Sequence, residues 1–89
     1  MGCYVNPQNE TKEEFLLKHG KRVRTDLEIT DTHLPVCLVD NGYFTAAMVA
    51  FNEGEIEAMN SPGDRRPKTW YIVSREELRK VSDLSRYER

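Results

Sequence analysis

The sequence is poor in the residues that build disulfide scaffolds and metal sites. Its 89 residues contain two cysteines, Cys3 and Cys37. Small secreted domains held together by disulfides normally carry about four or more. No Cys-x-x-Cys pair and no Cys/His ligand spacing occurs, so nothing in the sequence indicates zinc. We expect reduced thiols with no disulfide, no metal ion, no cofactor and a cytoplasmic location.

The sequence also lacks long hydrophobic runs and an excess of charge of one sign. No apolar run approaches the roughly 20 residues that cross a bilayer, and the chain does not open with the basic, apolar pattern of a signal peptide. With 13 Lys and Arg against 15 Asp and Glu, the formal net charge is −2. A balance this close to zero argues against a histone-like binder or a polyanion mimic. We expect one domain over residues 1–89 that does not associate with membranes.

Catalytic motifs are missing as well. The sequence has no glycine-rich phosphate loop, no His-Glu-x-x-His and no Gly-x-Ser-x-Gly. His33 and Cys37 are four positions apart on a predicted strand, which separates them by about 13 Å and prevents a hydrogen bond. Adjacent glutamates stand at predicted helix starts, where negative charge is favoured on electrostatic grounds alone. The sequence predicts no catalytic residues; an enzyme that uses Cys37 or a carboxylate is the weakest hypothesis.

Three helix starts can be recognised from the same local pattern. Thr11, Asn52 and Ser74 are each followed three positions later by Glu, which is the arrangement of a capping box. Gly20 and the Ser-Pro-Gly-Asp turn that begins at Ser61 supply stop signals. The pattern predicts helices over 12–19, about 53–60, and about 75–83. Residues 85–89 are expected to fray.

Two segments have the composition or the alternation of single strands. Residues 22–30 alternate apolar and charged side chains, which predicts a strand, and the charged positions favour the edge of a sheet. Residues 69–73 are aromatic and β-branched, which predicts a second strand. We also expect Cys3 at the start of a short strand.

The strongest local signal is Asn41-Gly42 between two apolar runs. It predicts a type I′ hairpin with a two-residue loop, because both central positions need φ > 0. That loop sets the register, with Val39 opposite Phe44 and Cys37 opposite Ala46. One face then carries Cys37, Val39, Phe44, Ala46, Met48 and Ala50, and the other carries Val36, Leu38, Ala47 and Val49. Pro35 lacks an N–H and favours an edge for the first strand, with the second strand central. A helix over 44–51 is the competing interpretation.

These elements predict an α+β fold. The expected order is α-β-β-β-α-β-α, with a small mixed β-sheet of about four strands and about three short helices packed on it. The connection from Phe51 to Thr69 contains a helix, so the strands that it joins can run parallel.

An arginine-rich loop followed by two aromatic residues is the best candidate for a binding surface. It comprises Arg65, Arg66, Lys68, Trp70 and Tyr71. Arg, Trp and Tyr most often anchor protein interfaces. Because neighbours on a strand alternate faces, we expect one of the two aromatics in the core. The plain alternative is that the loop only connects a helix to a strand.

The sequence therefore favours a non-enzymatic protein–protein interaction or inhibitor module with a protein partner that it does not identify. Small regulatory and mobile-element proteins, including anti-CRISPR-like inhibitors, share the size class only. The alternative is a nucleic-acid-binding module that uses residues 65–68 and a secondary basic patch of Lys18, Lys21, Arg22 and Arg24. The acidic balance of the whole chain opposes that alternative. Pairing of an exposed edge into a homodimer stays open.

Overall fold

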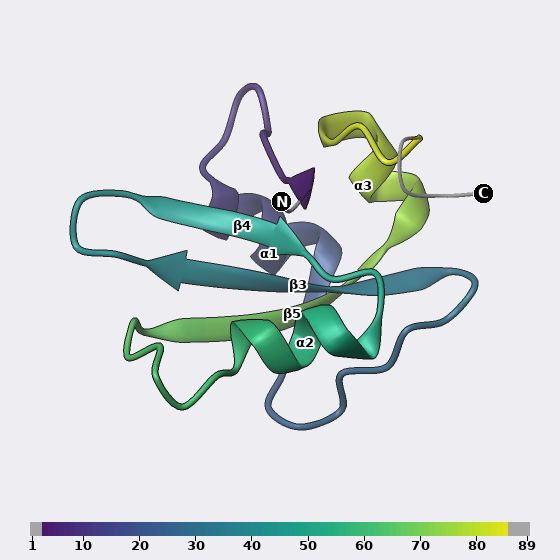
Figure 1. The fold of residues 1–89 in the computed structure, drawn as a ribbon. Coiled ribbons are helices and arrows are strands. Elements are labelled where there is room, and N and C mark those ends of the chain that lie inside the picture. The colour runs from purple at the N-terminus through teal and green to yellow at the C-terminus, as the bar shows by residue number, and fades with distance from the viewer. Residues whose placement is uncertain (1–2, 86–89) are drawn as a thin grey trace.

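The computed structural model describes residues 3–85, so most of the predicted C-terminal tail lies outside the described residues. Three helices and a five-stranded sheet confirm the α+β class (Figure 1). No helix in the described part of the chain is long and apolar enough to cross a membrane. In chain order the elements are β1 (Cys3–Tyr4), α1 (Lys12–His19), β2 (Gly20–Val23), β3 (His33–Asp40), β4 (Thr45–Val49), α2 (Glu53–Met59), β5 (Lys68–Ser74) and α3 (Arg75–Val81).

The strand order in the sheet is β1-β4-β3-β5-β2, and every neighbouring pair is antiparallel. The prediction of a mixed sheet was therefore wrong. The strands β4 and β5 do run in the same direction, as the α2 connection suggests, but both of them pair with β3, which lies between them. The strand beyond the expected four is β1, where Cys3 pairs with Val49.

Each face of the sheet has its own apolar cluster. On what we call the α1/α3 face, Leu16 and Leu78 pack with Val36 and Tyr71. On the opposite face, which we call the α2 face, Ile56 and Met59 of α2 pack with strand residues such as Trp70. Figure 1 shows α2 in front of the sheet and α1 behind it. A sheet covered on both sides has two-sided apolar strands, which explains the continuous apolar run of β3.

The hairpin forms with a longer loop than predicted. Asp40 pairs with Thr45, so four residues lie between β3 and β4, and Cys37 faces Met48 instead of Ala46. The side chain of Asn41 explains the difference, because its Oδ1 accepts the backbone N–H groups of residues 43 and 44 at 3.0 Å each. Within residues 3–85 only Gly42 has positive φ, at 91°, so the turn is not type I′. The alternative helix over 44–51 is excluded by β4.

The central strand of the sheet is β3, not β4, although β3 contains Pro35. The carbonyl of Pro35 accepts the backbone N–H of Ala50 at 2.9 Å, just beyond the last residue of β4. In a strand the N–H and C=O groups of one residue point to the same neighbour. The N–H that Pro35 lacks would therefore point toward the β4 side, at a position beyond the end of β4. The hydrogen bonds between β3 and β5 are not weakened.

The strand predicted over 22–30 is shorter and begins earlier, at Gly20–Val23. Beyond it, Leu27 packs against the cluster on the α2 face, whereas Ile29 packs against the cluster on the α1/α3 face. The alternating apolar residues therefore belong to a connecting segment whose side chains reach both clusters. The backbone N–H of His33 donates to Thr30 Oγ1 at 3.0 Å, which guides the chain into β3.

The first two predicted capping boxes are confirmed at their N-cap residues. Thr11 accepts from the N–H of Glu14, and Asn52 accepts from the N–H of Glu55. The third is not formed, because the side chain of Ser74 makes no capping hydrogen bond. The backbone N–H of Arg75 instead donates to the carbonyl oxygen of Thr32 at 2.8 Å.

Candidate interaction surfaces

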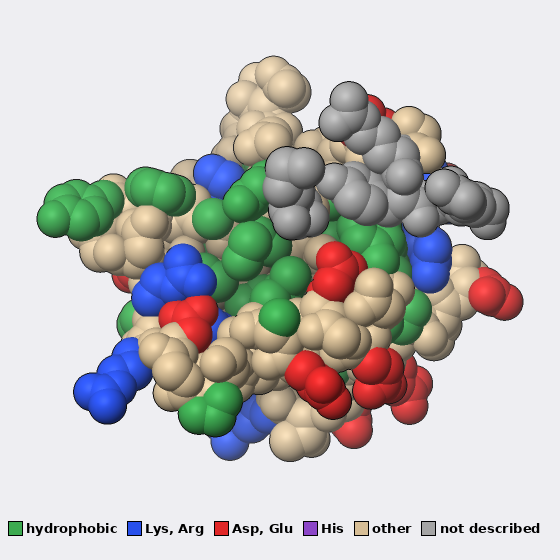
Figure 2. All heavy atoms as spheres, viewed as in Figure 1, with side chains coloured by type: hydrophobic (Ala, Val, Ile, Leu, Met, Phe, Trp, Pro, Cys, Tyr) green, Lys and Arg blue, Asp and Glu red, His purple; other side chains and the backbone are tan. Residues whose placement is uncertain are grey.

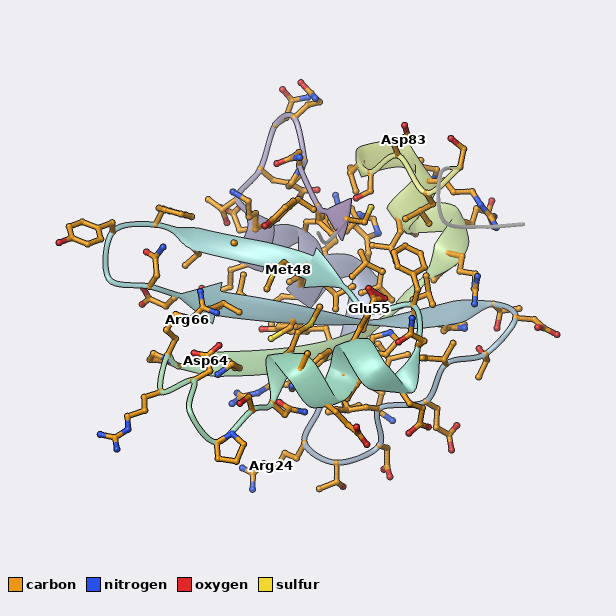
Figure 3. All side chains as sticks on the ribbon, in the orientation of Figure 1. Arg24, Met48, Glu55, Asp64, Arg66 and Asp83 are labelled. Atoms are coloured by element: carbon orange, nitrogen blue, oxygen red, sulfur yellow. The ribbon has the colours of Figure 1, made fainter. Side chains whose placement is uncertain are left out.

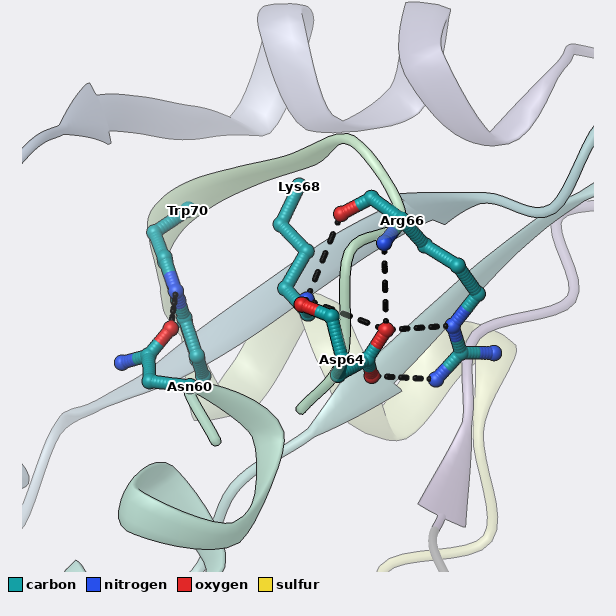
Figure 4. A network of polar contacts seen from close by, with 5 residues as sticks. All are labelled: Asn60, Asp64, Arg66, Lys68 and Trp70. Atoms are coloured by element: carbon teal, nitrogen blue, oxygen red, sulfur yellow. Dashed lines mark hydrogen bonds and ion pairs between the residues drawn. The ribbon is translucent and has the colours of Figure 1, made fainter. Parts of the chain in front are cut away.

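The two aromatics of the predicted binding loop are core residues. Trp70 and Tyr71 point to opposite faces of β5 and are 6% and 4% exposed. Trp70 Nε1 donates to Asn60 Oδ1 at 3.0 Å, which ties the strand to the end of α2 (Figure 4). We expected one of the two rings in the core, and both are buried, because helices cover both faces of the sheet.

The basic residues of the same loop are divided between an internal network and the surface. Arg66 donates from Nε to Asp64 Oδ1 at 2.9 Å and from Nη2 to Oδ2 at 2.7 Å (Figure 4). Lys68 Nζ lies 3.3 Å from the same carboxylate and also donates to the carbonyl oxygens of Asp64 and Arg66. The hydrogen bonds from Arg66 hold the pKa of Asp64 well below its usual range. Arg65 is exposed.

The hairpin loop and residues 65–67 lie together at one end of the molecule. The backbone N–H of Asp40 donates to the carbonyl oxygen of Pro67 at 3.1 Å. The two segments line one shallow hollow. Figure 2 shows hydrophobic side chains projecting where the hairpin ends. In the hairpin loop, Tyr43 is 96% exposed and Phe44 is 63% exposed. We call Tyr43, Phe44, Arg65 and Pro67 the hairpin-end surface.

Sequence reasoning missed the two exposed aromatics because it placed them in the ladder of a tight hairpin. The asparagine side chain at position 41 binds their amides and keeps both residues in the loop. The sequence did contain a signal for this surface. Two bulky aromatic residues directly follow Asn41-Gly42, and a solvent-exposed turn does not need bulky aromatic residues to form.

A second hollow, of about 250 Å³, lies between the hairpin and α2. Its apolar side chains are those of Val39, Met48, Ala58 and Met59, and its polar side chains are those of Glu55, Asp64, Arg66 and Lys68. Figure 3 shows Met48, Glu55, Asp64 and Arg66 around it. The carboxylate of Glu55 already accepts the backbone N–H of Phe51 at 2.8 Å. The polar groups of this hollow are thus largely engaged within the chain.

The thiols and histidines do not form a catalytic arrangement. Cys37 is fully buried, and burial raises the pKa of its thiol to about 11 although Lys68 and Arg66 oppose that change. His33 lies at the start of β3, where its Nδ1 is 2.8 Å from Thr32 Oγ1. A thiol that is both protonated and buried is a poor nucleophile. Among the described residues no group of three or more His, Cys, Asp or Glu side chains could hold a metal ion.

The secondary basic patch lies along the outer edge of the sheet. Lys21 and Arg22 belong to β2, the last strand in the order, and Lys18 precedes them in α1. Arg24 follows β2 and is labelled in Figure 3 at the lower margin of the molecule. All four side chains are exposed. Within residues 3–85 none of the four makes an ion pair or a side-chain hydrogen bond.

The structure therefore presents two surfaces of different character. The hairpin-end surface is aromatic with one exposed arginine, and the β2 edge is basic, with backbone groups that pair with no other strand of the described chain. Comparison of the chain with known protein-family models, curated proteins and solved structures gives no match.

Proposed function

We propose that this chain is a protein-binding module, of inhibitory or regulatory type, that engages a protein partner through the hairpin-end surface. The observation that carries the proposal is the exposure of Tyr43 and Phe44, at 96% and 63%, in a hairpin loop whose first residues line one hollow with the exposed Arg65. Large aromatic rings and arginine supply most of the binding energy in protein interfaces. Two neighbouring rings in water contribute little to the stability of the chain itself, so their placement favours a binding role.

Charge at this end favours a protein partner over a nucleic acid. Arg66 and Lys68 are engaged with Asp64, so Arg65 is the single unpaired cation of the loop. The carboxylate of Asp40 lines the adjoining hollow. Binding to a polyanion depends on several unpaired cations in a row. A protein interface needs only a few well-placed anchors.

The rigidity of the surface also supports this role. Asn41 Oδ1 accepts two backbone N–H groups, and Asp40 Oδ1 accepts the N–H of Gly42 at 2.8 Å. The loop that carries the two rings is thus held by three side-chain hydrogen bonds. Preorganisation of this kind lowers the entropy that is lost when a partner binds.

The test is affinity capture from a lysate of the source organism, comparing the wild type with the double variant Tyr43→Ser/Phe44→Ser. We expect the double variant to lose its specific partner, with affinity for the purified partner falling at least about thirtyfold. Leu17→Ser is the control, because Leu17 is also an exposed large apolar residue, 59% exposed, on α1. If the double variant retains every partner of the wild type, the hairpin-end surface is not the binding site.

A further inference from the structure

The geometry points to a second binding site at the outer edge of β2, which accepts an extended acidic polypeptide segment as an added strand. Within residues 3–85 the strand β2 pairs only with β5, so its backbone groups that face away from β5, those of Arg22 among them, have no strand partner. In the described part of the chain, residues 21–23 make no backbone hydrogen bond outside the sheet ladder. A free edge of this kind can take up a partner strand through main-chain hydrogen bonds.

The side chains of the edge set the chemistry of that partner. Arg22 pairs with Tyr71 and therefore lies on the α1/α3 face, whereas Lys21 pairs with Ile72 and lies on the α2 face. Basic side chains thus flank the free edge on both faces, and none of them has an acidic partner in residues 3–85. An added strand with carboxylates would satisfy them, and charges opposed across a strand pair stabilise it.

The same charges disfavour a second copy of this chain at this edge. Self-pairing of β2 brings Lys21 and Arg22 against basic residues of the other copy, and like charges placed opposite each other destabilise a strand pair. Lysine on edge strands is a common protection against such association. A protective role and a selective role are compatible here, because a charge that rejects a basic strand attracts an acidic one.

A polypeptide fits this edge better than a nucleic acid does. Asp26 and Glu28 line a hollow on the α2 face together with Lys21. A nucleic acid carries one negative charge per nucleotide and would meet these carboxylates. A peptide strand places successive side chains on opposite faces, so carboxylates at every second position share one face and can all be directed to Arg22 on the α1/α3 face. The segment from Lys18 to Arg24 also contains no exposed aromatic ring on which a base could stack.

The experiment uses a fluorescent eight-residue peptide that alternates glutamate with threonine and valine, titrated against the full chain by fluorescence anisotropy. We expect saturable binding, with hydrogen exchange slowed at the amide of Arg22, the residue of β2 whose N–H points away from β5. The variant Lys21→Gln/Arg22→Gln, which changes two exposed side chains only, should weaken binding at least about tenfold. Arg65→Gln is the matched control and should bind the peptide as the wild type does.

A second probe separates strand addition from simple attraction between charges. The same peptide with alternate backbone amides N-methylated keeps its charge but loses the donors that a strand pair needs. Weaker binding of this peptide supports the proposal, and equal binding overturns it. Tighter binding of a single-stranded oligonucleotide of equal charge also overturns it, and identifies the edge as a nucleic-acid site. This site is independent of the hairpin-end surface, so Tyr43→Ser/Phe44→Ser should leave peptide binding unchanged.

Discussion

The two basic segments of this chain resemble each other in composition and differ in what they contact. Arg66 and Lys68 share the carboxylate of Asp64, which lies close enough in sequence to be reached within one loop. Lys21 and Arg22 contact no acid in residues 3–85, although Asp26 and Glu28 follow closely. Asp26 and Glu28 line a hollow together with Lys21, but neither carboxylate forms an ion pair with Lys21 or Arg22.

The difference shows that a cluster of positive charge has no fixed role. In the loop before β5, Arg66 and Lys68 hold a turn in place, so their substitution is expected to affect the stability of the fold. At the β2 edge, the cations support nothing within the chain, so substitution is expected to affect association with other molecules. Exposed unpaired charges contribute little to folding free energy. Substitutions in the loop before β5 should therefore change stability more than association, and substitutions at the β2 edge should change association more than stability.

The largest expected effect on stability is at Trp70, a residue of β5 that follows the loop of Asp64, Arg66 and Lys68. Its hydrogen bond to Asn60 ties β5 to the end of α2. Trp70→Ala should lower the free energy of unfolding by about 3–5 kcal/mol, because a buried ring is replaced by a cavity. Trp70→Phe, which keeps most of the ring but loses the hydrogen bond to Asn60, should cost about 1 kcal/mol from that bond and more from lost packing. Urea denaturation followed by circular dichroism measures both.

The control for this prediction is Tyr43→Ala, which removes a ring that is 96% exposed. Its effect on the free energy of unfolding should stay within about 0.5 kcal/mol. Equal effects of Trp70→Ala and Tyr43→Ala would contradict the assignment of Trp70 to the core and of Tyr43 to the surface.

The hairpin shows how far the sequence predicts the fold. The loop is two residues longer than Asn41-Gly42 alone predicts, and Phe44, predicted on the opposite face, lies in the loop. The α1/α3 face is nevertheless as predicted, since Val36, Leu38, Ala47 and Val49 share it. Side chains on a strand alternate with a period of two, so a slip of two residues changes the partners and keeps the faces. The loop length depended on hydrogen bonds from Asn41 that composition does not reveal.

The candidate site was harder to predict than the fold, for a physical reason. The aromatic character of Trp70 and Tyr71 was visible in the sequence, but their exposure depends on helices from distant parts of the chain that cover each face. The basic residues of β2 were recognised as a patch, whereas their place on a free edge follows from the strand order. Long-range packing decides which side chains reach solvent, and local patterns carry little information about it.

An intermediate effect is expected where Asp64 binds Arg66 and Lys68. Because the pKa of Asp64 is lowered in the folded chain by the hydrogen bonds from Arg66, its contribution to stability is complete above the ordinary value of 3.8 and is lost as the pH falls through the lowered pKa. Asp64→Asn should therefore reduce the melting temperature at neutral pH, by less than Trp70→Ala does.

The check is a series of thermal melts from neutral pH into strong acid. The difference between Asp64→Asn and the wild type should shrink as the solution becomes more acidic than the ordinary pKa of this carboxyl. Asp31→Asn, a change at an exposed carboxyl of the 24–32 segment, is the matched control and should show a smaller difference throughout. A difference for Asp64→Asn that is constant across the whole range would mean that the carboxylate does not stabilise the loop through its charge.

The smallest effect on stability, and a clear effect on association, is expected at the β2 edge. Lys21→Thr/Arg22→Val should change the free energy of unfolding by only about 0.5 kcal/mol, because both side chains are exposed and unpaired. The double variant replaces charges that discourage edge pairing with residues that favour strands. Sedimentation velocity at increasing concentration should show dimers or larger species for this variant and not for the wild type. Arg65→Val removes one exposed charge outside β2 and should stay as monomeric as the wild type. Association of both variants to the same extent would show that surface charge in general, and not the free edge of β2, keeps the copies apart.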